Sequence, residues 1–543
     1  MFFRKVIKNH GLSLLALTFF VAVAYFNALH GAFLSDDVAM LKDPHWTSFS
    51  HIFKNDLYII SGLARYITVR IGGNQPFFYH LTNISFHLLN VWLVYFLILT
   101  MTQKESYRKK LAFFTAGFFA VHPLLTETVT WISGMGYALF TIFILSSFIT
   151  FIKYIQNRSL KYYFVSVVLF IFSILVSDKA FVFSLILVMY YLTYLPKEKN
   201  WKLLIPYFIS SLLFIFIVII PQFGARVQSM HQIANLKGSY INFVQPVVTF
   251  ASYLRLFIYP SKLTLYHTEP IFQSTTIISY AVLIGYIAML LYFWCKEKKI
   301  FFWLIFFVIA TSYAISPFLI ASFIGERYVY LGSIGIFYFL SCVLIFIDRK
   351  LKNSYFSWTV FILLMIILIA RTIVRNNDWQ TPQTFWAREV LISPYSYQTH
   401  NNYGIVLFNQ HDYTNAEAEF KKSLILAPNI GETHQDLAYV YHITGSIQDA
   451  FNEYEDAIKL DPTLWRSYGN LAVIYFANKD YDDALVYSLA ALKGDPTNSD
   501  IITNIGLAYL NKGDKTKARE WFEKALRLDP MNSKAADDLK LIH

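Results

Sequence analysis

Apolar runs of about 20 residues recur along roughly the first two thirds of this 543-residue chain. An α-helix of that length crosses the hydrocarbon core of a lipid bilayer. The composition agrees, because only 15% of the residues are charged, whereas about 25% are charged in an average soluble domain. The sequence therefore predicts an all-α, multi-pass membrane region with a further part attached to it.

Clusters of Lys and Arg set the predicted orientation of the spans, because basic residues are enriched in cytoplasmic loops. With these clusters inside, residues 1–375 hold eleven predicted transmembrane helices, and the C-terminal tail lies on the opposite side from the N-terminus. The predicted spans are residues 11–30, 77–100, 110–123, 131–153, 161–177, 179–195, 202–221, 275–294, 300–320, 327–347 and 354–374. The apolar stretch 245–260 is predicted to be interfacial or re-entrant, because a further crossing would move the cluster at Lys296 outside.

The net charge of +11 is divided unevenly along the chain. Residues 376–543 contain 15 basic and 23 acidic residues, a balance of −8, and the remainder contains 31 and 12, a balance of +19. The basic excess follows the predicted loops and accompanies no nucleic-acid-binding motif. We therefore expect membrane lipids, and no nucleic acid, among the partners.

The C-terminal part repeats itself every 34 residues. The recurring positions are Ala416, Ala450, Ala484 and Ala518, followed by Pro428, Pro462, Pro496 and Pro530. This period is typical of tetratricopeptide repeats, in which helix pairs stack into an α-solenoid. We predict a linker at residues 376–396, four repeats at 397–530, and a capping helix at 531–543 that covers the last apolar edge. The repeats are expected to bind a protein acceptor or partner; the alternative is a rigid spacer or an oligomer contact.

Acidic residues are scarce in the membrane part, and eight of its 12 fall on the predicted outer side. They are Asp36, Asp37, Asp43, Asp56, Glu127, Asp178, Glu269 and Glu326. The adjacent Asp36 and Asp37 directly follow the first apolar run. They are either a helix cap or loop that faces water, or a general base or ligand set at the mouth of an active site. The outward bias of the other acids favours the active site.

Basic and polar side chains accompany these acids on the same predicted side. They are Arg65, His122, Lys179, Arg226, His267 and Arg327. Cations hold a phosphate and stabilise charge on a leaving group, and a carboxylate takes the proton of an acceptor hydroxyl. The pattern predicts a lipid-phosphate donor. Transporters also use intramembrane charges, but place them near mid-span, whereas these lie at helix ends and in outer loops. A stripe of His80, Asn83 and His87 on one helix face is interpreted as structural.

Five motifs occur in a fixed order ahead of the repeats. They are SDD at 35–37, HPLLTETVTWISG at 122–134, SDKAF at 177–181, IGERYVYLGSIG at 324–335 and RNNDWQTPQTFW at 375–386. This order resembles the transmembrane and tetratricopeptide repeat-containing O-mannosyltransferases and their bacterial relatives, which are glycosyltransferases of the GT-C class. The HP-x-x-TE and ERY-x-Y-x-x-S-x-G motifs are the specific part of the resemblance, which covers nearly the whole chain.

The resemblance implies a polyprenyl- or dolichyl-phosphate sugar donor, often mannose, and inverting transfer to protein hydroxyls on the outer or lumenal face. It implies Asp36 or Asp37 as the base that activates the acceptor, with Asp36 favoured. The family is not defined by a metal, so no cofactor is expected to be required, although an acidic pair can bind a divalent cation.

By the same resemblance, His122 and Glu127 would shape the sugar and acceptor site, and Glu326 and Arg327 would hold the donor, with Arg327 reaching the phosphate. Two positions depart from the family. Asp178-Lys179 stands where relatives often have Lys-Glu, and Ala64-Arg65-Tyr66 stands where they often have Tyr-Arg-Pro. The departures bear on the identity of the donor more than on the class of reaction.

Three functions are consistent with the sequence. The leading one is a membrane glycosyltransferase that moves a hexose, mannose by resemblance, to Ser/Thr of exported proteins. The second is a non-catalytic membrane anchor for repeats that assemble envelope proteins. The third is a transferase of the same class that acts on a glycan or lipid. The abundance of Ile, Lys, Asn, Phe and Tyr indicates a bacterial inner-membrane protein with a periplasmic site, or a site in the endoplasmic reticulum lumen if the protein is eukaryotic.

Overall fold

The computed structural model describes most of the chain. The described residues are 2–38, 48–55, 58–195, 200–221, 244–267, 273–315, 324–353 and 355–542. Helices are the only regular secondary structure within these stretches, which confirms the all-α class. The chain divides into two compact units, Met1–Ile392 and Ser393–His543.

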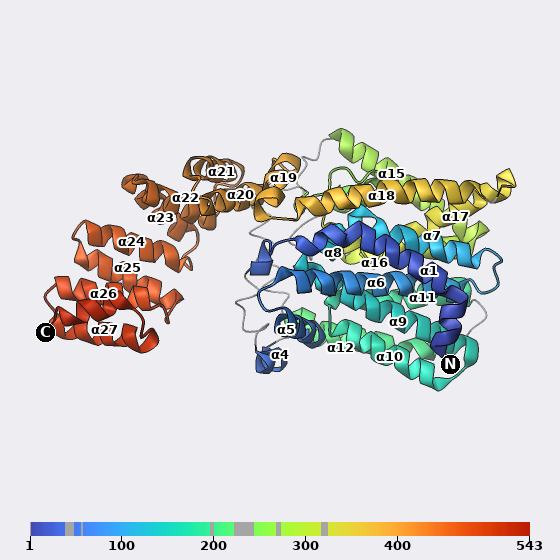
Figure 1. Ribbon diagram of the computed structural model, residues 1–543, viewed down its shortest axis with the longest axis horizontal. Coiled ribbons are helices and arrows are strands. Elements are labelled where there is room, and N and C mark those ends of the chain that lie inside the picture. Colours follow the sequence, from blue (N-terminus) through green and yellow to red (C-terminus); the bar gives the residue numbers. More distant parts are fainter. Residues whose placement is uncertain are drawn as a thin grey trace. The chain divides into compact units, whose positions relative to one another are not determined.

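In the first unit, a helix lies in each of the eleven ranges predicted to cross the membrane (Figure 1). They are α1 (Phe2–Tyr25), α6 (Pro76–Met101), α7 (Arg108–Val121), α9 (Met135–Asn157), α10 (Leu160–Ile174), α11 (Val182–Tyr194), α12 (Ile205–Phe214), α15 (Gln273–Lys296), α16 (Lys298–Ile315), α17 (Ser333–Leu351) and α18 (Phe356–Asp378). Within the described residues, six helices are long and apolar enough to span a membrane, or seven if a bent pair counts as one span. These helices indicate a membrane protein, and the full count of eleven stays a prediction.

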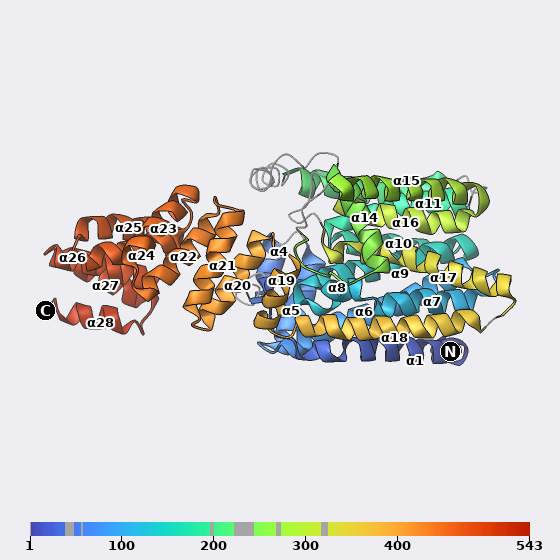
Figure 2. The same ribbon diagram turned by 90° about the horizontal axis from the view of Figure 1, so that it is seen from above.

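Short elements connect the long helices. They are η1 (Phe26–His30), α4 (Phe49–Asn55), α5 (Ile59–Gly72), η2 (Pro123–Leu125), α8 (Thr126–Thr130), η3 (Ile132–Gly134), η4 (Asp178–Phe181), η5 (Trp201–Leu204), η6 (Ile215–Ile219), α14 (Val244–Ile258), η7 (Glu326–Val329) and α19 (Pro382–Ile392). Figures 1 and 2 both show α5, α8 and α19 at one end of this unit, with the N-terminus at the other. The stretch predicted to be interfacial forms α14, whose 15 residues are fewer than a span needs.

The core of the first unit holds a stripe of polar side chains on α6. Asn83 Nδ2 donates to the Trp131 carbonyl at 2.9 Å, and Asn90 Nδ2 donates to that of Ala138 at 2.8 Å. His87 Nε2 lies 3.1 Å from the Ala120 carbonyl, and its Nδ1 lies 2.7 Å from the Tyr330 hydroxyl. Buried polar groups with partners of this kind fix helix positions. The structural interpretation of the stripe agrees with these contacts.

The second unit consists of four helix pairs and a final helix. They are α20 (Tyr397–Asn409) with α21 (Tyr413–Leu426), α22 (Gly431–Thr444) with α23 (Ile447–Leu460), α24 (Trp465–Ala477) with α25 (Tyr481–Gly494), α26 (Ser499–Asn511) with α27 (Lys515–Leu528), and α28 (Ser533–Lys540). Small residues explain the close pairing: a Cβ at Gly506 would lie 2.6 Å from the Phe522 ring. Ala450 and Ala518 are fully buried.

The boundary between the units differs from the predicted one. Residues 376–396 were expected to form a linker, but α18 continues to Asp378 and α19 belongs with the first unit. Trp379, Phe385 and Trp386 are buried, and Glu389 accepts hydrogen bonds from the loop at residues 264–265. Burial of these three aromatic side chains stabilises the segment, whereas a linker exposed to solvent would gain no such stabilisation.

Candidate active site

The candidate site is built on the segment at residues 122–134, at the end of the first unit where α8 lies (Figure 2). His122 directly follows α7, and the chain bends by 56° before α8. The His122 Nδ1 accepts the Leu124 N–H at 3.3 Å, and Nε2 donates to the Phe257 carbonyl at 3.1 Å. Both ring nitrogens therefore hold the main chain of the bend. These contacts shape the bend, and the role of His122 in shaping the sugar and acceptor site stays a prediction.

The two adjacent aspartates after the first helix have different surroundings. Asp37 is buried, and its carboxylate accepts hydrogen bonds from the Leu34 N–H at 3.0 Å, the Ser133 N–H at 3.0 Å and the Ser133 hydroxyl at 2.6 Å. Asp36 is exposed, and Ser35 before it has a φ of +53°, a region that residues other than glycine rarely adopt. Asp37 thus fixes the turn to the 122–134 segment and leaves the Asp36 carboxylate accessible.

Burial raises the pKa of Asp37, and its hydrogen bonds with Ser133 oppose that rise. A carboxyl group in this position accepts the hydrogen bonds that hold the loop, whereas a base needs access to its substrate. The geometry therefore assigns Asp37 to positioning and leaves Asp36 as the candidate base.

Glu127 and Arg327 form a buried ion pair between segments 200 residues apart. Glu127 accepts hydrogen bonds from both the guanidinium and the main-chain N–H of Arg327, the latter at 2.9 Å. The guanidinium carbon lies 5.2 Å from the centre of the Trp131 ring and 4.7 Å from that of Tyr328. A guanidinium in this setting stays charged and is held in one orientation.

A second cation faces the same group of aromatic rings, named here the tyrosine cluster (Tyr137, Tyr313 and Tyr328). Lys179 Nζ lies 5.5 Å from the centre of the Tyr137 ring and 5.9 Å from that of Tyr313. It also donates to Asp178 at 3.0 Å, and its side chain is 26% exposed. The rings of Tyr137 and Tyr328 are 6.0 Å apart. The cluster therefore lies between the two cations, Lys179 and Arg327.

A network of buried charges includes Glu326, the residue before Arg327. Glu326, fully buried, accepts the Thr264 N–H at 2.6 Å and lies 3.5 Å from His267 Nε2. Its other oxygen has no hydrogen-bond partner among the described residues. Burial raises the pKa of Glu326. Glu326 thus binds the loop that carries His267, and its role in holding the donor stays a prediction.

Two further residues of this network, Arg375 and Glu389, were not predicted as site residues. Arg375 lies 3.5 Å from Glu389 and 3.3 Å from Asp378. Glu389 accepts the Thr264 hydroxyl at 2.6 Å and the Leu265 N–H at 2.8 Å. Glu389 thereby fixes the loop whose Thr264 N–H binds Glu326. Its sequence position, next to the acidic repeats, gave no signal of this role; Arg375 lies in the RNNDWQTPQTFW motif.

The remaining predicted residues are placed as follows. Arg65 is half-buried on α5, one helical turn after Ser61. The Ser61 hydroxyl lies close to Gly136 at the start of α9: a Cβ added at Gly136 would be 4.0 Å from it. Arg65 therefore lies on the side of α5 that faces the start of α9. Arg226, Asp43, Asp56 and Glu269 lie outside the described residues. In the described stretches, no three His, Cys, Asp or Glu side chains are grouped closely enough to hold a metal ion.

The arrangement can support transfer chemistry. One carboxylate is accessible, two cations flank an aromatic cluster, and buried hydrogen bonds hold the loops between them. Cations fixed in advance stabilise negative charge that develops on a leaving phosphate. Sequence reasoning missed the tyrosine cluster, because 18% of all residues are aromatic and no spacing distinguishes Tyr137 and Tyr313 from the rest. Only Tyr328 carried a signal, since it lies in the ERY motif.

Models of the tetratricopeptide repeat match residues 395–461, 453–486 and 499–532, which confirms the predicted repeats. Mouse protein O-mannosyl-transferase TMTC3 is 28% identical over 151 residues, which cover 24% of this chain and 16% of the relative. Human protein O-mannosyl-transferase TMTC1 is 31% identical over 157 residues, which cover 25% of this chain and 17% of the relative. The crystal structure of MamA aligns with 27% of this chain and 87% of its own at 22% identity, with a TM-score of 0.26.

The chain spans only about a sixth of the length of the curated relatives that it matches. The similarity confirms the resemblance to the O-mannosyltransferase family that the motifs indicated. The apolar helices indicate a membrane protein, and the repeats suggest protein–protein interaction.

Proposed function

We propose that this protein is an integral-membrane glycosyltransferase of the GT-C type. It transfers a hexose, mannose by resemblance, from a polyprenyl-phosphate donor to Ser or Thr hydroxyls of exported proteins. We place it in a bacterial inner membrane, with the site and the repeats on the periplasmic side. The observation that carries the proposal is the pairing of one accessible carboxylate, Asp36, with two fixed cations, Lys179 and Arg327.

The acceptor hydroxyl is activated by Asp36. As its oxygen attacks the anomeric carbon, the proton passes to the Asp36 carboxylate, and the bond from that carbon to the donor phosphate breaks. Direct attack inverts the anomeric configuration. Asp37 positions the base, because its three hydrogen bonds tie the turn to Leu34 and Ser133. General-base catalysis of this kind is worth about 10²–10⁴-fold in rate.

The leaving polyprenyl phosphate carries the negative charge that develops in the reaction. Lys179 and Arg327 stabilise this charge, while Glu127 and Trp131 hold the guanidinium of Arg327 in place. Because the protein fixes these cations before the donor arrives, little reorganisation is needed during the reaction. The Tyr137 ring beside Lys179 offers an apolar face suited to packing against a sugar ring.

The test is transfer of labelled mannose from polyprenyl phosphate to a Ser/Thr-containing peptide, with the full chain in nanodiscs. The Asp36→Asn variant is expected to lose at least about 10²-fold in rate, with unchanged thermal stability. Glu105→Gln is the matched control, since Glu105 pairs with Lys299 at the far end of α6; it should retain the parent rate.

Two results would contradict the proposal. Parent rates in both Asp36→Asn and Asp37→Asn would remove the base. Restoration of a deletion strain by the second unit alone, Ser393–His543, would instead favour the non-catalytic scaffold. Mass spectrometry of exported proteins, glycans and lipids from strains with and without the chain distinguishes a protein acceptor from the other acceptors.

A further inference from the structure

A histidine in the second repeat joins both helices of that repeat and the turn that precedes them. His434 lies in the first turn of α22, and its Nδ1 is 2.6 Å from a carboxylate oxygen of Glu453 on α23. Its Nε2 is 2.8 Å from the main-chain carbonyl of Pro428, six residues earlier. This arrangement of a histidine, a glutamate and a proline carbonyl is named here a histidine clamp.

A second histidine clamp lies 34 residues earlier, in the first repeat. His400 Nδ1 is 2.5 Å from Glu419 on α21, and His400 Nε2 is 3.0 Å from the Pro394 carbonyl. All three members of the clamp therefore recur at the same positions of the repeat, with nearly the same distances. Each clamp fixes the first helix of its repeat against the second.

The two later repeats have other side chains at the equivalent positions. In the third repeat they are Tyr468 and Tyr487, whose ring centres are 6.2 Å apart. In the fourth they are Ile502 and Trp521. One solenoid thus contains two repeats whose helices are joined through a titratable ring and two whose helices are joined through apolar or aromatic side chains at that place.

The hydrogen-bond partners of each clamp require a charged histidine. A carboxylate oxygen and a main-chain carbonyl oxygen can only accept, and a neutral imidazole has one N–H to donate. The imidazolium ion has two, so it alone satisfies both partners at once. Burial opposes the charged form of His434, but the hydrogen bonds to Glu453 and to the Pro428 carbonyl outweigh burial and raise the pKa of His434.

The other charged groups around His434 come from three helices. Asp456 on α23 adds a second negative charge that favours the charged ring. Lys421 on α21 lies over a tyrosine ring of α22 instead, 5.6 Å from its centre. On α22 itself, burial raises the pKa of Asp436 to about 7 and lowers the pKa of His442. These two groups titrate independently of the clamp and must be held constant in any test of it.

The surroundings of His400 are similar. Glu419 also accepts a hydrogen bond from Lys422 at 2.8 Å, so its carboxylate joins two cations. From α22, Asp436 faces Asn401, whose Nδ2 is 3.5 Å away. The negative charge that faces His400 is therefore that of Glu419.

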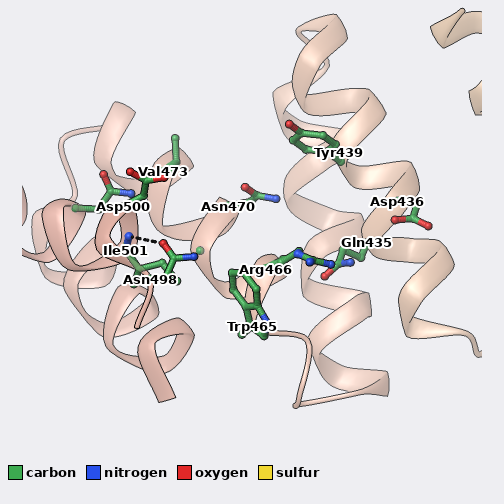
Figure 3. Close-up of a pocket in the computed structure, with 12 residues that line it drawn as sticks. Gln435, Asp436, Tyr439, Trp465, Arg466, Asn470, Val473, Asn498, Asp500 and Ile501 are labelled. Carbon is green, nitrogen blue, oxygen red and sulfur yellow. Dashed lines mark hydrogen bonds between the residues drawn. The ribbon is translucent and has the colours of Figure 1, made fainter. Parts of the chain in front are cut away.

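A pocket of about 460 Å³ lies among α22, α24 and α26, the first helices of three consecutive repeats (Figure 3). Gln435, Asp436 and Tyr439 contribute the α22 side of the pocket, and they follow His434 directly in the sequence. The α24 and α26 sides belong to the repeats without a clamp. Loss of the clamp would therefore loosen one side of the pocket and leave the other two unchanged.

We infer that the two histidine clamps make the first half of the solenoid sensitive to protons, so that α20–α23 open more often as the pH rises from about 5.5 to about 8. When the ring loses a proton, either the glutamate or the proline carbonyl loses its donor. The helices α24–α27 lack the clamp and do not share this change. The behaviour requires neither a sugar donor nor the transfer reaction.

The direction of the effect follows from the hydrogen bonds. A histidine that is stabilised in its charged form adds stability that is complete below the unfolded pKa of about 6.5. That stability is lost as the pH rises through the pKa of the folded state. The first two repeats should therefore be better protected in mildly acidic than in mildly basic solution.

The test is hydrogen–deuterium exchange of the full chain in nanodiscs at about pH 5.5 and about pH 8, with rates corrected for the intrinsic effect of pH. Protection of α22 and α23 should fall by at least about tenfold between the two conditions, relative to α24 and α25, because a hydrogen bond to a charged group is lost. Protection of α20 and α21 should fall in the same way.

Glu453→Gln isolates the contribution of the clamp. It keeps an acceptor oxygen for His434 but removes the negative charge, so the loss of protection in α22 and α23 should shrink to less than about threefold. Glu455→Gln is the matched control on the same helix, because Glu455 pairs with a lysine of α23; it should behave as the parent does. The other titrating groups of α22 are the same in both variants, so their effects cancel.

A double variant tests the same point without leaving a broken clamp. His434→Tyr combined with Glu453→Tyr gives the second repeat the pair that the third repeat has at these positions, Tyr468 and Tyr487. In this variant α22 and α23 should respond to pH as α24 and α25 do, while α20 and α21 keep the response of the parent.

Three outcomes would overturn the inference. They are an equal loss of protection in all four repeats, a pH response in Glu453→Gln equal to that of the parent, and greater protection of α20–α23 at about pH 8 than at about pH 5.5. The first would show a general effect of charge on the solenoid, and the second would assign the pH response to other groups of α22.

Discussion

Ion pairs differ in kind between the two units. In the first unit several join distant parts of the chain: Glu127 pairs with Arg327 across 200 residues, and Lys110 pairs with Asp348 at 2.5 Å across 238 residues. In the second unit many lie on one exposed helix surface, three or four residues apart. Examples are Lys421–Glu417, Lys459–Asp456, Lys517–Asp514 and Lys540–Asp537.

The contrast predicts how strongly the stability of each unit depends on its ion pairs. Exposed pairs contribute about 0–1 kcal/mol, because water screens them and two flexible side chains must be ordered. Removing one partner of a buried pair leaves an uncompensated charge and costs about 3–5 kcal/mol. The distant pairs of the first unit should therefore be sensitive to single charge changes, and the exposed pairs of the second unit tolerant of them.

The largest expected effect follows from breaking the Glu127–Arg327 pair. Glu127→Gln should lower the free energy of unfolding by about 3–5 kcal/mol, because Arg327 is left charged and largely buried. Lys459→Ala in the second unit should leave it close to the parent value, because the Lys459 side chain is exposed to solvent. Thermal unfolding of the full chain in detergent measures both.

A double variant sharpens this test. Glu127→Gln combined with Arg327→Gln should be more stable than Glu127→Gln alone, because no buried charge remains without a partner. Transfer should stay lost in the double variant, since the phosphate-binding cation is gone. Equal effects of Glu127→Gln and Lys459→Ala would remove the proposed difference between the units.

An intermediate effect is expected at Glu389. Glu389→Ala removes the acceptor for the Thr264 hydroxyl and the Leu265 N–H, and two buried donors without partners cost about 1–3 kcal/mol each. Transfer should fall, because this loop also supports Glu326. Glu389→Gln keeps an acceptor oxygen and should recover part of both losses. If Glu389→Gln recovers neither stability nor transfer, the charge of Glu389 toward Arg375, rather than its hydrogen bonds to the loop, accounts for both losses.

The smallest expected effect lies in the second unit and depends on pH. Burial raises the pKa of Asp436 to about 7. The pKa of such a carboxyl group is higher in the folded state than in the unfolded state. The group therefore does not reduce the stability of the fold at pH 4, and it reduces that stability progressively as the pH rises toward the pKa of the folded state. Asp436→Asn should therefore unfold like the parent at pH 4 and at a higher temperature at pH 8, by a few degrees.

The measurement for Asp436 is the thermal midpoint of the second unit at the two pH values. Asp461→Asn serves as the control, because Asp461 lies at the end of α23 and does not line the pocket. An equal shift of the thermal midpoint in Asp436→Asn and Asp461→Asn would contradict this prediction. So would a parent protein that gains stability relative to Asp436→Asn between pH 4 and pH 8.

The candidate site could be predicted in part. Asp36, Glu127, Lys179 and Arg327 were found because acids are scarce in an apolar region and the motifs around them are specific. The different roles of Asp36 and Asp37 could not be predicted, since they depend on Ser133, 96 residues further along the chain. Nor could the sequence predict that both ring nitrogens of His122 hold the main chain, at Leu124 and Phe257.

The sequence by itself determined the helices and the repeats. Apolar runs, basic clusters and a 34-residue period are local patterns, and a helix or a repeat forms from contacts between residues close in sequence. Only the tertiary structure decided which charges meet. Glu389 joins the loop at Thr264, and Arg327 joins Glu127, because packing of distant helices buries them together, and the free energy of a buried pair depends on its surroundings rather than on its spacing along the chain.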